Sequence, residues 1–182
     1  MDVRGAPPDA EVVARVLGGD AEAFGIVIRR YEAGLQRFAT RMLGSRDAAA
    51  DAVAEGFVRA YRHLASCREP ARLRTWLYRI VTNRCKSHLA RRSVADVPLD
   101  DAPPVADPSD SAAALERAEQ LALVNRALTA LSPDKREAFV LKHVEGLSYE
   151  EMAAVTGERI PTLKMRVHRA REALLKALEE YA

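Results

Sequence analysis

Apolar residues recur every three or four positions along most of the chain, and no segment shows the two-residue alternation of a half-buried strand. This pattern predicts an all-α protein. In the first part of the chain it predicts helices over residues 11–17, 20–42, 47–64 and 72–92. In the last part it predicts helices over residues 121–131, 133–145, 148–156 and 160–171.

Residues 93–111 interrupt the helical pattern. They contain four prolines, which remove backbone donors and disfavour helix in the preceding residue, and five aspartates without any basic residue. This composition predicts an acidic, largely extended linker. We expect two small helical domains around it. The first is a helical bundle over residues 19–92, preceded by a short helix within 1–18, and the second is a helical domain over 112–182.

The strongest local motif lies near the end of the chain. Ser148 and Glu151 have the spacing of a capping box, which satisfies two backbone donors at the start of a helix. Gly157 suits a sharp turn, and Pro161 suits the first turn of the next helix. This order is typical of a helix-turn-helix, whose second helix enters the DNA major groove. The alternative is an antiparallel helical hairpin with a solvated charged face.

The formal net charge of +2 conceals an uneven distribution of charge. Basic residues crowd segments 68–92 and 159–176, while the predicted linker between them is acidic. The basic residues of the last predicted helix are expected to meet DNA phosphates: Lys164, Arg166, Arg169 and Arg171. Their cationic stripe is separate from the apolar stripe of the same helix, which favours the DNA-binding interpretation.

The predicted helix over 72–92 combines cations with aromatic rings. Trp76, Tyr78 and Asn83 stand among its arginines. Rings beside cations suit single-stranded nucleic acid, because bases stack on the rings and the cations neutralise phosphates. Two alternatives stay open at this point: Trp76 as a core anchor, and the charged face as an ordinary solvated surface.

With both regions in view, the chain resembles the small bacterial sigma factors of the extracytoplasmic-function (ECF) group in the sigma-70 family, from about residue 19 to 178. A first set of motifs, in residues 51–61 and 75–83, is similar to the second region of the family. A second set, in residues 131–153 and 162–171, is similar to the fourth region. Both sets on one chain are far more specific than either alone.

The resemblance implies partners and roles. Contacts with core RNA polymerase, at its beta-prime clamp, are expected from Asp51, Glu55 and Arg59. Recognition and opening of the minus-ten promoter element are expected from Arg74, Trp76, Arg79, Asn83, Lys86, Arg91 and Arg92. Reading of the minus-thirty-five element is expected from Thr162, Lys164, Met165, Arg166, His168, Arg169 and Arg171. The resemblance also implies contact with the polymerase beta flap, a linker threaded through polymerase channels, and inhibition by an anti-sigma protein.

The chain departs from the family pattern at several positions. Ala50, Ala54 and Gly56 replace the usual larger or polar residues around the polymerase-binding helix, so this contact is expected to be weaker or differently arranged. Pro161 and Met165 replace the usual small residues of the recognition helix, which puts the usual minus-thirty-five preference in doubt. Leu73 stands in place of an aromatic residue.

Other functions explain less of the chain. A conventional helix-turn-helix regulator would account for residues 147–171 but leaves Asp51, Glu55 and Trp76 without a purpose. No phosphate loop, zinc-protease motif or nucleophile with an adjacent base indicates an enzyme, and no small-molecule substrate or cofactor is expected. A helical adaptor without a nucleic-acid role is the third alternative.

Two remaining expectations concern metal and location. The spacing of His63, Cys67, Cys85 and His88 would suit a zinc site, but these residues fall on helices that other roles explain, so no metal is expected. The chain has no apolar run long enough to span a membrane and no secretory signal at its start. We therefore expect a cytoplasmic protein without membrane insertion, which an anti-sigma factor could hold at the membrane.

Overall fold

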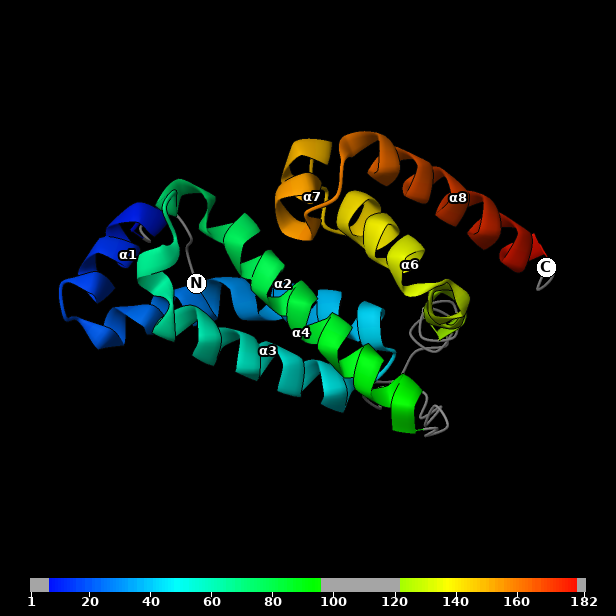
Figure 1. Cartoon of the computed structure of the whole chain (residues 1–182). Coiled ribbons are helices and arrows are strands. Elements are labelled where there is room, and N and C mark those ends of the chain that lie inside the picture. The colour runs from blue at the N-terminus through cyan, green and yellow to red at the C-terminus, as the bar shows by residue number, and fades with distance from the viewer. Residues whose placement is uncertain (1–6, 96–121, 180–182) are drawn as a thin grey trace, which may run out of the picture.

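The structure, a computed structural model, describes residues 7–95 and 122–179, and all its regular elements are helical. The first range contains α1 (Asp9–Leu17), α2 (Phe24–Leu43), α3 (Arg46–Arg62) and α4 (Leu73–Ala95), with short 3-10 helices at Ala21–Ala23, Leu64–Ser66 and Pro70–Arg72. The second range contains a helix over residues 122–130, then α6 (Pro133–Phe139), the π-helical turn η5 (Val140–Val144), α7 (Tyr149–Thr156) and α8 (Ile160–Glu179). The predicted all-α fold is confirmed (Figure 1).

The helix ends follow the predicted stop and start signals closely. The Asp20 side chain accepts a hydrogen bond from the Ala23 backbone N–H, and Gly44 ends α2 in the left-handed conformation. Ser45 then caps α3 by accepting a hydrogen bond from the Ala48 backbone N–H. The end of the fourth predicted helix was wrong, because α4 continues beyond residue 92 to Ala95. The rest of the predicted linker, residues 96–111, lies outside the described residues.

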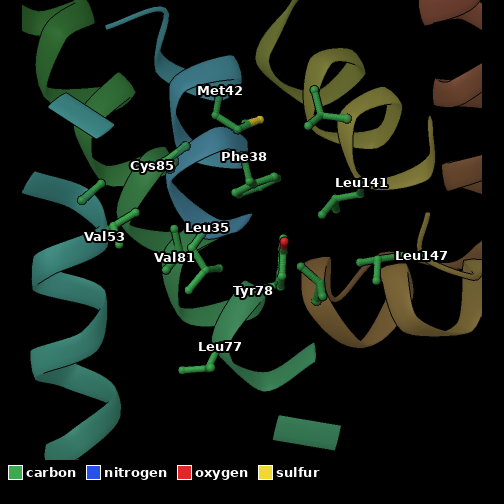
Figure 2. Packing of buried hydrophobic residues seen from close by; sticks show 14 of the residues in the cluster. Leu35, Phe38, Met42, Val53, Leu77, Tyr78, Val81, Cys85, Leu141 and Leu147 are labelled. Atoms are coloured by element: carbon green, nitrogen blue, oxygen red, sulfur yellow. The ribbon is translucent and has the colours of Figure 1, made fainter. Parts of the chain in front are cut away.

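Helices α2, α3 and α4 pack side by side around a continuous apolar core. Leu35 and Phe38 of α2, Val53 of α3 and Leu77 of α4 all point into it (Figure 2). Helix α3 approaches α4 unusually closely at Gly56, where an added Cβ atom would lie 2.8 Å from a Val81 methyl carbon. A larger residue at this position would therefore push the two helices apart.

A buried arginine organises the C-terminal half. Arg136 of α6 is 6% exposed and donates hydrogen bonds to the carbonyl oxygens at the end of the helix over 122–130, namely those of Leu128, Thr129 and Leu131. The last carbonyls of a helix have no partner within the helix itself. Arg136 supplies that partner, which explains why a charged residue tolerates burial here.

The helix that begins at Pro133 changes its winding before it ends. After α6 the chain forms the π-helical turn η5, and the Glu145 N–H donates to the Val140 carbonyl, five residues earlier, at 3.0 Å. A π turn contains one residue more than an α turn and is rare in proteins. The sequence pattern predicted a regular helix over 133–145, so the π turn was not anticipated.

The two halves of the chain contact each other directly. Helix α7 packs on α4, and both α6 and η5 pack on α2, so that the C-terminal helices lie along one side of the N-terminal bundle (Figure 1). Leu141 and Leu147 face the buried ring of Tyr78 across this boundary (Figure 2). Arg136 also crosses it, because its guanidinium donates a hydrogen bond to the Met42 carbonyl of α2.

Candidate nucleic-acid interface

The predicted helix-turn-helix is present, with its capping box formed. The Ser148 hydroxyl accepts a hydrogen bond from the Glu151 N–H at 3.1 Å, and the Glu151 carboxylate accepts one from the Ser148 N–H at 2.7 Å. Gly157 has a φ of +78°, a conformation that side chains disfavour, and its N–H donates to the Ala153 carbonyl at 2.9 Å. These contacts fix the turn between α7 and α8.

Helix α8 presents its basic side chains to solvent. Its apolar stripe is buried, as predicted, and packs mainly against α6; it consists of Leu163, Val167, Ala170 and Leu174. The predicted DNA-contacting residues that are exposed are Lys164, Met165, His168, Arg169 and Arg171. Thr162 and Arg166 are half-buried. The helix therefore carries an accessible cationic face opposite its core-facing side.

Arg166 differs from the other basic residues of α8 because it is paired within its own domain. Its guanidinium lies 3.2 Å from the Asp134 carboxylate and 3.1 Å from the Glu158 carboxylate. These two partners lie at the start of α6 and in the turn before α8. Arg166 thus ties the recognition helix to the rest of the domain, and its contact with DNA stays a prediction.

Lys164 lies beside an aromatic ring of the preceding helix. Its ammonium group is 5.6 Å from the centre of the Tyr149 ring, and the ammonium of Lys142 is 4.7 Å from the same centre. Cations are attracted to the faces of aromatic rings over such distances. Lys142 was not among the predicted contacts, although its charge belongs to the same surface.

The predicted minus-ten residues of α4 fall into distinct environments. Arg79, Asn83 and Arg91 are exposed. Trp76 is half-buried against the core, which agrees with both of its proposed roles. Arg92 is in α4, but its side chain lies outside the described residues. Arg74 and Lys86 are half-buried, and each lies beside a glutamate of the C-terminal half.

Arg74 meets the residue that follows the π turn. Its guanidinium donates a hydrogen bond to the Glu145 backbone carbonyl at 2.8 Å and lies 3.9 Å from the Glu145 carboxylate. The same carboxylate accepts a hydrogen bond from the Tyr78 hydroxyl at 2.5 Å. Burial and this hydrogen bond to Glu145 raise the pKa of Tyr78 well above its ordinary value. At 2% exposure, Tyr78 belongs to the core, so the predicted stacking role of its ring is wrong.

Lys86 meets a second buried glutamate. Its ammonium lies 3.0 Å from the carboxylate of Glu137, which is 1% exposed. Burial raises the pKa of Glu137, although the charge of Lys86 acts in the opposite direction. Burial and the nearby Glu137 also raise the pKa of the Cys85 thiol to about 12. Cys85 is therefore an unreactive buried thiol at neutral pH.

Helix α3 carries the predicted polymerase-binding residues on its exposed side. Asp51, Glu55 and Arg59 are all exposed. Glu55 lies 3.9 Å from Arg84 of α4, beside a shallow pocket of about 460 Å³ between the two helices. Tyr61, near the end of the same helix, is 46% exposed.

Both halves of the chain are similar to known protein domains. Residues 27–94 match the family model for sigma-70 region 2, and residues 121–174 match the model for sigma-70 region 4. The chain is 35% identical to the RNA polymerase sigma-H factor of Pseudomonas aeruginosa, with 94% of each chain covered. It is also 35% identical to the ECF RNA polymerase sigma-E factor of Escherichia coli, with 91% of this chain and 92% of that one covered.

This chain belongs to the ECF group of sigma-70 family sigma factors. It is a transcription initiation factor, as the two motif sets predicted. The sigma factor is also similar to solved structures. It matches the sigma factor RpoE, crystallised with the anti-sigma factor NepR from Bartonella quintana, with a TM-score of 0.73 and 29% identity over 87% of this chain and 98% of that one. It matches CnrH, in complex with the cytosolic domain of CnrY, with a TM-score of 0.72 and 28% identity over 97% of this chain and all of that one.

The region matches place the predicted site residues within family domains. All predicted polymerase and minus-ten residues lie in the segment matched by region 2, and all predicted minus-thirty-five residues lie in that matched by region 4. Sequence reasoning missed Arg136, Glu137 and Glu145 of this sigma factor. A signal existed for the first two, because they precede Val140 and Leu141 by one helical turn and so stand on an apolar face.

Two further expectations can be compared with the described ranges. Within residues 7–95 and 122–179, which include His63, Cys67, Cys85 and His88, no three His, Cys, Asp or Glu side chains form a group that could hold a metal ion. In the same ranges, no helix is both long and apolar enough to cross a membrane.

Proposed function

We propose that this sigma factor binds core RNA polymerase mainly through α3, recognises and opens the minus-ten element with α4, and reads the minus-thirty-five element with α8. The observation that supports this division of labour is that each half of the chain contains its own basic helix with exposed polar side chains. Lys164 and Arg169 on α8, and Arg79 and Asn83 on α4, are all exposed.

The polymerase contact is the proposed role of α3. Asp51 and Glu55 offer carboxylates on its exposed side, and Arg59 lies one turn further along. Val58 is an exposed apolar residue beside them, at 52% exposure. Charged residues around an apolar centre are typical of protein interfaces, which supports docking of this ridge onto the beta-prime clamp. We assign contact with the beta flap to the C-terminal domain.

The minus-ten contact is the proposed role of α4. Opening the duplex unstacks bases at a cost of a few kcal/mol, which contacts to the flipped base and to phosphates must offset. Asn83 offers an amide for a base edge, while Arg79 and Arg91 offer charge for phosphates. The half-buried ring of Trp76 supplies a rigid apolar edge next to them.

The minus-thirty-five contact is the proposed role of α8. Lys164 lies near the start of the helix, the part that reaches base edges in a helix-turn-helix complex. Met165 and His168 are exposed near it, and Arg169 and Arg171 are suited to phosphates further along. Thr162 completes the set proposed for base contact, and Arg166 contributes by orienting the helix.

Regulation by an anti-sigma protein is the third part of the proposal. One similar solved structure is of a sigma factor in complex with an anti-sigma factor, and another is of CnrH in complex with the cytosolic domain of CnrY. Their similarity over nearly the whole chain supports a comparable partner here. Since bacterial transcription takes place in the cytoplasm, we assign the protein to that compartment, with recruitment to the membrane when its inhibitor is membrane-bound.

Run-off transcription with core polymerase on a promoter library tests the proposal. We expect promoter-specific transcripts with the wild-type protein and a loss of roughly 10- to 100-fold in Lys164→Ala, because a base contact contributes about 1–3 kcal/mol. Lys176→Ala, which removes an exposed lysine from the last turn of α8, is the matched control. Tight operator-like binding without polymerase, together with no transcription in its presence, would instead indicate a conventional regulator.

A further inference from the structure

Two predicted minus-ten cations are already paired with carboxylates of the C-terminal half. Glu145 faces Arg74, and Glu137 faces Lys86. Carboxylates and DNA phosphates are both anions that arginine and lysine bind through charge-assisted hydrogen bonds. Each glutamate therefore places an anion beside a cation that we expect to meet a promoter phosphate.

The contacts of Glu145 are the most elaborate of this group. Its side chain is 8% exposed, and its carboxylate accepts the hydrogen bond of the Tyr78 hydroxyl at 2.5 Å. Arg74 donates to its backbone carbonyl at 2.8 Å and lies over the Tyr78 ring, 5.1 Å from the ring centre. We call Arg74, Tyr78 and Glu145 the interdomain clasp.

Buried contacts at the same boundary support the clasp. Leu141 and Leu147 are fully buried at the same boundary, and Arg136 reaches the Met42 carbonyl of α2. Apolar burial supplies the attraction between the halves, while the clasp fixes which residues of α4 are covered. Separation of the halves would expose this apolar surface and release Arg74 together.

We propose that, in the protein on its own, Glu145 holds the C-terminal half against α4 and places its anionic side chain beside Arg74, so that the Arg74 end of the minus-ten surface is self-inhibited while Arg79 and Asn83 stay exposed. The inference rests on the proposed function of α4. It adds that the covering group is part of this chain. Promoter DNA and polymerase then have to displace the clasp before Arg74 can contribute to binding of the minus-ten element.

The pairing of Lys86 with Glu137 belongs to the same boundary but is a less decisive target. Burial penalises the charged form of Glu137, so neutralising this residue removes a penalty as well as an attraction. Glu145 makes two different contacts with α4, one through its carboxylate and one through its backbone carbonyl. Substitutions of Glu145 and of its partner Tyr78 are therefore the sharper test.

The test measures single-stranded DNA binding by the full-length protein in the absence of polymerase. The probe is a fluorescein-labelled oligonucleotide of mixed sequence, followed by fluorescence anisotropy. When only the open fraction binds, apparent affinity falls by that fraction. We expect Glu145→Ala to bind roughly tenfold more tightly than the wild type. Glu32→Ala, which removes the same charge from an exposed position of α2, is the control and should bind like the wild type.

A second variant keeps the test independent of total charge. Tyr78→Phe removes only the hydroxyl that donates to Glu145 and preserves the ring packed against Phe38. We expect it to increase binding in the same direction. Both substitutions remove the same hydrogen bond between Tyr78 and Glu145. The double variant should therefore gain less affinity for the oligonucleotide than the product of the two single gains. Small-angle X-ray scattering should show a larger radius of gyration for each variant than for the wild type.

Several results would overturn the clasp. They are an extended wild-type protein in scattering, equal binding by Glu145→Ala and the wild type, or an equal gain in Glu32→Ala. Run-off transcription separates this failure from a failure of the proposed function. If the clasp is wrong but the function is right, the wild type and Glu145→Ala bind the oligonucleotide equally and both direct transcription. If the function is wrong, neither protein directs transcription, whatever the scattering shows.

Discussion

Helices α4 and α8 are both basic, yet the structure presents their cations in opposite ways. On α8, Lys164 and Arg169 are exposed and have no carboxylate from the other half of the chain as a neighbour in the described ranges. On α4, Arg74 and Lys86 are each paired with a glutamate of the other half. The difference shows that a basic helix in a sequence indicates DNA-binding capacity, whereas accessibility depends on the tertiary arrangement.

The largest expected effect comes from removing the arginine on which the C-terminal half depends. Arg136→Met leaves the carbonyls of Leu128, Leu131 and Met42 without their donor, and unsatisfied buried groups are costly. We expect the free energy of unfolding to fall by about 3 kcal/mol or more, measured by urea denaturation. The exposed Arg126→Met is the control. If both substitutions lowered the free energy of unfolding by the same small amount, the buried hydrogen bonds of Arg136 would not be what stabilises the C-terminal half.

A direct test of the contrast substitutes one lysine from each helix. Lys164→Ala should weaken binding of the free protein to duplex minus-thirty-five DNA by about 1–3 kcal/mol, because Lys164 is accessible. Lys86→Ala should change the DNA binding of the free protein little, because Glu137 already occupies this lysine, and should act only in promoter opening with polymerase. Electrophoretic mobility shifts and permanganate footprinting measure the two steps. An equal loss of free-protein binding in both variants would remove the contrast.

The position of α4 depends on its close approach to α3. Gly56→Ala should gain helix propensity but force its new methyl group against Val81, which lies at 2.8 Å. We expect a net destabilisation of about 1 kcal/mol, measured as a lower midpoint of thermal unfolding. Ala54→Gly, at an exposed position of the same helix, is the control, because it changes helix propensity without changing the packing of α3 on α4. A stabilised Gly56→Ala variant would mean that α4 can shift without cost.

The weakest expected effect is a dependence on pH. Because the pKa of Glu137 is raised above its ordinary 4.5, the folded protein keeps this proton at pH values where the unfolded chain has lost it. The free energy of unfolding should therefore fall as pH rises from 4.5 toward the raised pKa, and Lys86 limits the size of this fall. Glu137→Gln should show a flatter profile in urea denaturation across this window, whereas Glu32→Gln should follow the wild type.

Much of the fold could be predicted because it is encoded locally. The capping box of Ser148 and Glu151, the turn at Gly157 and the apolar stripe of α8 depend on residues a few positions apart, and all were confirmed. These features need no knowledge of how distant segments meet.

The rest could not be predicted because it depends on contacts between distant segments. Arg74 and Glu145 are 71 residues apart, and nothing near Arg74 indicates that a glutamate covers it. From the sequence alone, Tyr78 could equally be a stacking surface for bases, because its buried partner Glu145 lies far away in the chain. A charged residue on an apolar helical face, as at Arg136 and Glu137, is a sequence signal of a buried polar contact, but it does not indicate the partner.

The π turn at Val140–Val144 makes the clasp sensitive to chain length. Each residue of a helix turns the chain by about 100°, so the additional residue of this turn sets the direction in which Glu145 points. Deleting one residue there would restore regular winding and rotate everything downstream, the recognition helix included. Homologous chains that lack this residue would need a different anion, or none, opposite Arg74. Insertions and deletions in this short turn are therefore one way in which related proteins can differ in how strongly their C-terminal half binds to α4.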